Sequence, residues 1–496
     1  MKKGDILTAA VLRTEFPNKG ILYIDNQKII VKNALEGQVI RFSISKKRKD
    51  RLEGRLLEVI SPSPKELSRP ACIHFGECGG CAYQNLPYEE QLALKKRQVE
   101  NLIMQAGFDF PVEEICASPV TEGYRNKMEY TFGDEFKDGP LTLGMHKKNS
   151  FYDIVPISDC KITHPDFNTL LCAVLDYFQE KGTSYYHRMH HTGYLRHLVI
   201  RRSAKTGDIL LNLVTTSYGS LAEEEFAGRI LESSIHLQGQ IKGILHTIND
   251  SLADVVQSDE TRILYGQDHI EEQLFDLKFR ISPFSFFQTN TLSAEVLYSK
   301  VREYVENTKD KLIYDLYSGT GTIAQILAPV ARKVYGVEIV EEAVQAARLN
   351  AGINGLTNCE FIAGDVLKVL EELTEKPDII VLDPPRDGIN PKALKKIIGF
   401  GLENMVYVSC KPTSLIRDLA ILQEAGYQVK HCCLIDQFPG TVHVETVCLL
   451  SKLSEAKNHI SVKVGMDEME NITEQNRRWR NESEQDHQKR NNLYCG

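Results

Sequence analysis

Long hydrophobic runs are absent from this chain of 496 residues. No apolar stretch approaches the roughly 18 residues that a membrane-spanning helix needs, and the first residues, Met1-Lys2-Lys3-Gly4-Asp5, lead into no signal-peptide core. Internal repeats are also missing. These absences predict a cytoplasmic protein with no membrane partner, and the length predicts about three or four modules.

An overall excess of positive charge is also lacking, since the net charge is −8, which argues against a simple polyanion-binding protein. Residues 1–60 differ from the rest, because they hold 13 Lys and Arg against 7 Asp and Glu, with a basic cluster at residues 46–51. Five short β-rich runs in this segment predict a small barrel of the OB kind. Its charge indicates either a surface for phosphates or a solvated hairpin rim.

A disulfide framework is not expected, because cysteines in a chain without an export signal are more typical of thiols, metal ligands or catalysis. Cys72, Cys78 and Cys81 form a C-x5-C-x2-C pattern in a glycine-containing loop, and Cys160 is the candidate for a remote fourth ligand. Such a set of thiolates suits either zinc or an iron–sulfur cluster. Buried free thiols are the structural alternative.

The remaining modules follow from the pattern of apolar residues. Residues 65–285 predict a mixed, β-rich central domain that carries the cysteine loop, with a helix over Tyr88 to Ala106. Residues 286–453 alternate strand and helix, which predicts a doubly wound α/β domain. Residues 454–496 are polar and are expected to be disordered. The fold class is therefore α/β, with two further β-rich modules.

The full G-x-G-x-x-G motif of dinucleotide enzymes is missing from the first strand and turn of the α/β domain, residues 312–322. This favours S-adenosylmethionine as the cofactor. Asp315, Glu338, Asp365 and Asp383 lie on or near the ends of four consecutive predicted strands, where acids can accept hydrogen bonds from a ligand. Any one of these acids could instead cap the following helix.

Two residues further along the domain suggest chemistry on a ring. Cys410 ends a short apolar strand, 27 residues after Asp383, and is placed to act as a nucleophile. Glu445 interrupts the last apolar strand, where a carboxylate could simply face solvent. It follows Cys410 by 35 residues and offers the second acid–base group that such chemistry requires.

Taken together, these motifs resemble the RNA uridine C5-methyltransferase family. The resemblance covers roughly residues 1–453 and is carried by the cysteine set and four segments: Phe287-Gln288-Thr289-Asn290, Asp383-Pro384-Pro385-Arg386, Val408-Ser409-Cys410-Lys411-Pro412 and His443-Val444-Glu445-Thr446-Val447. It implies a class I methyltransferase domain of Rossmann-like fold, with a TRAM domain in residues 1–60. The glycine pattern of that N-terminal module is sparse, which is a departure from the family.

The resemblance also assigns roles. It implies a [4Fe-4S] cluster on Cys72, Cys78, Cys81 and Cys160. It implies contacts to S-adenosylmethionine from Gln288, Tyr317, Glu338 and Asp383, a further contact near the adenine from Asp365, and weaker candidates in Phe286, Asn290 and Thr322. Cys410 corresponds to the nucleophile of the family and Glu445 to its base. The cysteine set and the TRAM-like module are similar to the ribosomal-RNA branch, so 23S ribosomal RNA is the expected partner and transfer RNA the alternative.

The chemistry is consistent with this resemblance. Uracil C5 is a poor nucleophile, but addition of a thiolate at C6 makes C5 reactive toward a sulfonium methyl group, and the target base must be unstacked. We expect the protein to act as a monomer.

Three competing functions fit the residues less well. An iron–sulfur redox enzyme would leave Cys410 and Glu445 without a role, and the C-x3-C-x2-C spacing of radical enzymes is absent. A non-catalytic RNA-binding protein would not need the filled set of catalytic positions. Enzymes that form 5-methylcytosine resemble one another in a Pro-Cys pair after the acidic fourth strand, and this chain has Asp383-Pro384-Pro385-Arg386 in that place.

Overall fold

The computed structural model describes residues 1–150, 152–252, 258–306 and 308–453. The segment expected to be disordered, residues 454–496, lies outside the described residues. The chain from Met1 to Lys452 forms one compact unit. None of the described helices is long and apolar enough to cross a bilayer.

The N-terminal sheet has six strands, one more than the sequence predicts, and its order is β1-β5-β6-β4-β3-β2. The strands are β1 (Ile6–Ala10), β2 (Arg13–Glu15), β3 (Lys19–Ile24), β4 (Gln27–Lys32), β5 (Val39–Lys47) and β6 (Leu52–Ser61). Alternation along β5 buries Ile40, Phe42 and Ile44 on one face of the sheet, as expected of a sheet with one face toward a core. The basic cluster at residues 46–51 lies where β5 turns into β6.

The central region contains a seven-stranded sheet of order β10-β9-β8-β11-β12-β13-β14, preceded by α1 (Tyr88–Gln105). Its strands are β8 (Lys127–Asp134), β9 (Leu141–His146), β10 (Ile154–Pro156), β11 (Leu195–Arg202), β12 (Asp208–Thr215), β13 (Gln240–Ile248) and β14 (Glu260–Gly266). The helices α2 (Pro165–Glu180) and α3 (Glu223–Ser233) pack against it around Phe167, Phe178 and Phe226. A hairpin of β15 (Ile270–Leu274) and β16 (Leu277–Ile281) leads onward.

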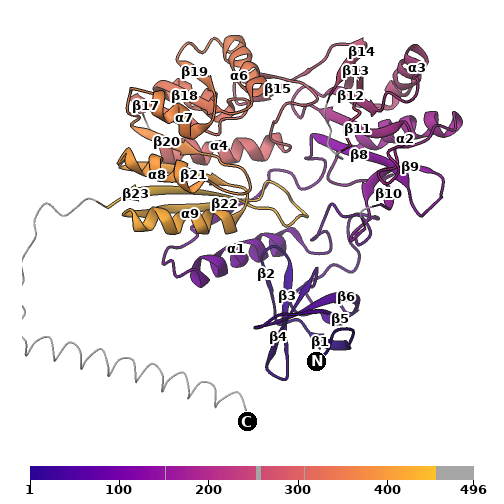
Figure 1. Cartoon of the computed structure of the whole chain (residues 1–496), viewed down its shortest axis with the longest axis horizontal. Helices are drawn as coiled ribbons and strands as arrows, with labels where there is room; N and C mark the ends of the chain where they lie inside the picture. The colour runs from indigo at the N-terminus through magenta and orange to yellow at the C-terminus, as the bar shows by residue number, and fades with distance from the viewer. Residues whose placement is uncertain (151, 253–257, 307, 454–496) are drawn as a thin grey trace, which may run out of the picture. The chain divides into compact units, whose positions relative to one another are not determined.

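The C-terminal sheet has eight strands in the order β19-β18-β17-β20-β21-β23-β22-β7 (Figure 1). They are β7 (Glu114–Cys116), β17 (Thr308–Leu316), β18 (Ala331–Glu338), β19 (Cys359–Ala363), β20 (Ile379–Leu382), β21 (Asn404–Ser409), β22 (Tyr427–Ile435) and β23 (Glu445–Lys452). The first five in this order run parallel, while β23 is antiparallel to both β21 and β22.

Helices cover both faces of this sheet, as in a doubly wound fold. They are α4 (Thr291–Val305), α5 (Thr322–Leu327), α6 (Glu341–Ile353), α7 (Val366–Glu372), α8 (Pro391–Gly399) and α9 (Pro412–Glu424). One core contains side chains of α4, α5 and α6, and the other contains side chains of α1, α7, α8 and α9. The strand order reverses at β17, which lies between β18 and β20, so a ligand is expected at the carboxyl ends of these strands.

Candidate active site

A cavity of about 1460 Å³ lies at the carboxyl ends of these parallel strands and continues to the cysteine loop. The predicted site residues that line it are Cys72, Cys78, Cys81, Cys160, Gln288, Tyr317, Glu338, Asp383, Cys410 and Glu445. Of the weaker candidates, Phe286 and Thr322 line it as well. The structure thus brings together residues that are far apart in the sequence, with two exceptions, Asp365 and Asn290.

The turn after β17 presents its backbone to the cavity. Tyr317 has a positive φ of 67°, which is uncommon for a residue with a side chain, and its N–H donates to the carbonyl of Val337 at 2.9 Å. Gly321 has a φ of 71°, and a Cβ there would clash with the ring of Phe361. The glycine is therefore required by both conformation and space. This turn is the local reason that a ligand can approach the backbone closely.

Glu338 ends β18 and is held in place by the same turn. Its two carboxylate oxygens accept hydrogen bonds from the N–H groups of Gly319 and Val340, both at 3.0 Å. Because each carboxylate oxygen can accept more than one bond, Glu338 retains capacity for hydroxyl groups of a ligand.

Asp365 does not line the cavity. It is exposed, and its Oδ1 accepts a hydrogen bond from the N–H of Leu367 at 3.0 Å, which caps α7. Helix capping was the alternative role for each of these acids, and Asp365 therefore has at least this role. Its charge nevertheless raises the pKa of Tyr317, a cavity residue, together with the larger effect of burial.

Asn290 is fully buried and caps α4 through the N–H of Ser293. Its amide also donates to the carbonyl of Gln437, at 2.9 Å, and to Ser118. Gln437 in turn donates to Gln288 Oε1 at 2.7 Å. Asn290 therefore supports the loop that orients Gln288, rather than facing the cavity itself.

Three acids at this end of the sheet have raised pKa values; Asp383 and Glu445 line the cavity, and Asp315 does not. Burial raises the pKa of Asp315 to about 8 and that of Asp383 to about 7. Burial and the nearby Asp383 raise the pKa of Glu445 to about 8, which Arg386 partly opposes. Asp383 keeps some surface open to the cavity although protein atoms surround it. Among the described residues none of the three acids forms an ion pair, and the positive charge of Arg386 offsets the group only in part.

Cys410 lies at the end of β21, where the sequence predicts it. Its pKa is raised to about 11, mainly by burial and further by the charges of Glu445 and Asp383, while Arg386 lowers it. The thiol and both acids line the same cavity. Without a ligand the thiol is protonated at neutral pH, so a nearby cation or a proton acceptor is needed to form the thiolate.

The four cysteines of the predicted cluster line the cavity and form no disulfide with another described cysteine. Burial raises the pKa of Cys81 to about 12, and the charges of Cys160, Cys78 and Cys72 add to this effect. The backbone N–H of Gly80 donates to the sulfur of Cys78. In the part of the chain that the structure describes, no group of three or more His, Cys, Asp or Glu is arranged to hold a single metal ion.

Two features of the site escaped the sequence reasoning. His443, quoted only as part of a motif, lines the cavity, and burial lowers its pKa to about 4, so the ring is neutral at physiological pH. Lys95 of α1 is fully buried and bonds Asp436 Oδ1 at 2.6 Å, next to the loop that precedes Glu445. One face of α1 carries three polar residues that are all buried, Gln91, Lys95 and Gln98. Their spacing is the sequence pattern that could have predicted a polar partner on this face.

The donor set fits S-adenosylmethionine. Within the described part of the chain, Asp315 Oδ1 near the end of β17 and Ser318 Oγ in the turn after it are buried without a hydrogen-bond partner. Acids without an ion-pair partner at a cavity match a ligand with a positive sulfonium and a positive amino group. Gln288, Tyr317, Glu338 and Asp383 line the surrounding wall.

Comparison with known proteins agrees with this geometry. A relative from Clostridium tetani, described as an uncharacterized RNA methyltransferase, is 49% identical over 451 residues, which cover 90% of this chain and 98% of the relative. A similarly described protein from Clostridium acetobutylicum is 48% identical and covers 91% of this chain and 99% of its own length. The crystal structure of Pyrococcus abyssi tRNA (uracil-54, C5)-methyltransferase with S-adenosyl-L-homocysteine shares 27% identity, with a TM-score of 0.71, and covers 90% of this chain and 100% of that one. Residues 87–453 match the model of the tRNA (uracil-5-)-methyltransferase family, and the chain therefore belongs to this family of S-adenosylmethionine-dependent RNA uracil C5-methyltransferases.

Proposed function

We propose that the protein methylates C5 of a uridine in RNA through a covalent adduct between Cys410 and C6 of the base. The observation that carries this proposal is that Cys410, Glu445 and Asp383 line one cavity at the carboxyl ends of the strands. A base that reaches this cavity must leave its stack. The exposed ring of Phe286 on the cavity wall offers an apolar surface for it.

In the first half of the reaction, the thiolate of Cys410 forms a bond to C6, and the electron pair of the C5–C6 double bond moves toward C5 and O4. C5 would then bond to the methyl carbon of the cofactor as the S–CH3 bond breaks, with that electron pair left on the sulfur of S-adenosylhomocysteine. S-adenosylmethionine supplies the methyl group and, as a cation, offsets the acids that raise the pKa of Cys410. The chain contributes position and electrostatics to this half, through Gln288, Glu338 and Asp383.

In the second half, Glu445 removes the proton from C5. The electrons of that C–H bond re-form the C5–C6 double bond, and the C6–S bond breaks to release the Cys410 thiolate. A pKa near 8 suits this role, because a base works best when its pKa lies near the working pH. The buried position of Glu445 explains the raised pKa and also shields the adduct from water.

The two roles can be separated by trapping. Cys410→Ala should bind RNA and cofactor but form no covalent species. Glu445→Gln should add to uracil and transfer the methyl group, then stall, because an amide cannot remove the C5 proton. It should accumulate a protein–RNA adduct that survives a denaturing gel and carries label from the methyl donor. Normal turnover by Glu445→Gln, or an adduct without label, would show that another group is the base.

For the substrate we propose 23S ribosomal RNA. The cysteine set and the N-terminal module support this choice by their resemblance to the ribosomal branch, whereas the Pyrococcus abyssi relative acts on transfer RNA, which keeps transfer RNA as the second candidate. Mapping 5-methyluridine in ribosomal and transfer RNA from a deletion strain separates them. Loss of the mark from transfer RNA alone would overturn our choice.

We further propose that Cys72, Cys78, Cys81 and Cys160 hold a [4Fe-4S] cluster. Support comes from the thiol donors that line one cavity and from the Gly80 N–H that reaches the sulfur of Cys78. Protein purified anaerobically should then contain iron and absorb broadly near 400 nm, roughly where iron–sulfur charge transfer lies. Cys160→Ala should lose iron, whereas Cys172→Ala, an exposed thiol outside the set, should retain it. Stoichiometric zinc without iron, or equal loss in both variants, would contradict the assignment.

A further inference from the structure

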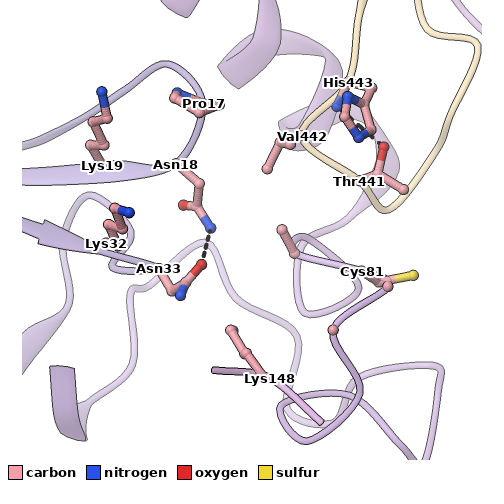
Figure 2. A pocket seen from close by; sticks show the side chains of 13 residues that line it. Pro17, Asn18, Lys19, Lys32, Asn33, Cys81, Lys148, Thr441, Val442 and His443 are labelled. Atoms are coloured by element: carbon pink, nitrogen blue, oxygen red, sulfur yellow. Dashed lines mark hydrogen bonds between the residues drawn. The ribbon is translucent and has the colours of Figure 1, made fainter. Parts of the chain in front are cut away.

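A second cavity, of about 320 Å³, lies beside the large one. It is formed where turns of the N-terminal sheet meet the cysteine loop and the segment before β23, as Figure 2 shows. Gly80, Cys81, Thr441 and His443 line both cavities. The two cavities therefore share a wall, and in Figure 2 the sulfur of Cys81 points away from the smaller one.

Three lysines from separate parts of the chain line this small cavity. Lys19 begins β3, Lys32 ends β4, and Lys148 lies between β9 and β10. None of the three forms an ion pair with another described residue, and no Asp or Glu is among the residues that line the cavity. Burial lowers the pKa of Lys148, which shows that this ammonium group is partly removed from water. A partly desolvated cation without a carboxylate partner favours binding of an anion.

The polar residues between the lysines are held in place before any ligand binds. The N–H of Asn33 donates to the carbonyl of Asn18 at 2.9 Å, and the two side chains meet at 3.5 Å, as drawn in Figure 2. Asn18 and Asn33 both have positive φ, at 124° and 61°, a conformation that asparagine tolerates better than most residues. The cavity thus combines fixed amide groups with three cations and no acid.

We propose that this small cavity binds a backbone phosphate of the RNA next to the uridine that enters the large cavity. The inference rests on the proposed RNA substrate and extends it to a defined contact. When a base leaves its stack, the backbone phosphate attached to its nucleotide moves with it. Because the two cavities share the wall at Cys81 and His443, a base in the large cavity leaves its phosphate near the small one. Lysine ammonium groups are well suited to phosphate oxygens as point charges.

The test measures RNA binding without turnover, so a failure of methyl transfer is not mistaken for a failure of this site. The probe is a fluorescein-labelled RNA hairpin with uridines in its loop, titrated with the full chain over a series of salt concentrations. The triple variant Lys19→Gln, Lys32→Gln, Lys148→Gln should bind about 10- to 100-fold more weakly, and the slope of its plot of log affinity against log salt should flatten by about 0.7 to 0.9, the change expected when one phosphate contact is lost. Cofactor affinity should stay unchanged.

The matched control removes the same charge from another surface. Lys376, Lys392 and Lys395 are exposed, line neither cavity and form no ion pair with a described residue. Replacing these three lysines by Gln should weaken binding by less than about threefold, because only long-range attraction is lost. Equal losses in the two triple variants would show that net charge acts rather than a site, and would overturn the inference.

A second measurement asks whether the lysines act on one phosphate. Hairpins that carry a neutral methylphosphonate at one position at a time should show one position, beside the uridine, where neutralisation weakens binding to the wild-type protein. At that position the triple variant should show no further loss, because the contact is already gone. Additive losses at every position would contradict a single phosphate site.

Discussion

Two groups of buried charged residues lie close to the segment that leads into β23, and they differ in one respect. Lys95 and Asp436 are both fully buried and form an ion pair at 2.6 Å. Asp315, Asp383 and Glu445 are also deep in the protein, but no cation is paired with them among the described residues. The first group is compensated within the chain, whereas the second has raised pKa values and awaits a ligand. Buried acids without an ion-pair partner therefore indicate the reactive site, whereas the buried ion pair stabilises the structure next to it.

Hydrogen bonds from two helices hold the loop that contains Asp436 in place. Lys95 also donates to the carbonyl of Phe438 at 3.1 Å, and the carbonyl of Asp436 accepts from Ser293 of α4. Between these anchors Gln437 reaches Gln288. Through this loop, α1 and α4 fix both Gln288, a proposed cofactor contact, and the start of the strand that carries Glu445.

Breaking the compensated pair should have the largest effect. Lys95→Met leaves the Asp436 carboxylate buried without its cation, so the free energy of unfolding should fall by about 3 to 5 kcal/mol, measured by urea denaturation. Lys96→Met, the next residue, is the control, because its ammonium lies 3.9 Å from Glu100 at the surface and should contribute less than about 1 kcal/mol. Adding Asp436→Leu to Lys95→Met should restore much of the loss. No difference between Lys95→Met and Lys96→Met would show that the buried pair is not stabilising.

The acids without an ion-pair partner should behave in the opposite way. The pKa of Glu445 is about 8 in the folded protein, against about 4.3 in an unfolded chain. The folded state therefore holds an extra proton between these values, and its stability falls as pH rises from about 4.3 to about 8. Glu445→Gln removes this penalty. Its gain in unfolding free energy should be near zero at low pH and reach about 1 to 3 kcal/mol above pH 8, to the order of magnitude that such shifts allow.

Urea denaturation at several pH values measures this gain. The control is Glu360→Gln, an exposed acid in β19 with its carboxylate beside Lys333 at the surface, which should show no such dependence on pH. A gain that is constant across pH would mean that the effect of Glu445→Gln comes from packing rather than from the buried charge.

The sequence predicts features that depend on neighbouring residues better than contacts between residues far apart in the chain. Apolar spacing predicted α1 within one residue, and Glu338 and Asp383, two of the four acids at the predicted strand ends, line the cavity, because both patterns are local. The pairing of Lys95 with Asp436 joins residues 341 positions apart, and no local pattern encodes such a contact. The short strand β2 was missed for a related reason, since three residues carry too little alternation to detect.

Asp365 belongs to neither group, and it gives the smallest predicted effect. Its carboxylate caps α7, while the family resemblance places it near the adenine of the cofactor. Asp365→Ser separates these roles, because serine caps a helix about as well as aspartate but is too short to reach a ligand. We expect its melting temperature to match that of the wild type and its affinity for S-adenosylmethionine, measured by calorimetry, to fall about 3- to 10-fold, the equivalent of one hydrogen bond. Asp365→Ala should lose the same affinity and, in addition, about 1 kcal/mol of stability with the cap. Cofactor affinity that is unchanged in both variants would leave Asp365 as a helix cap alone, and the adenine contact would then have to come from a residue that lines the cavity.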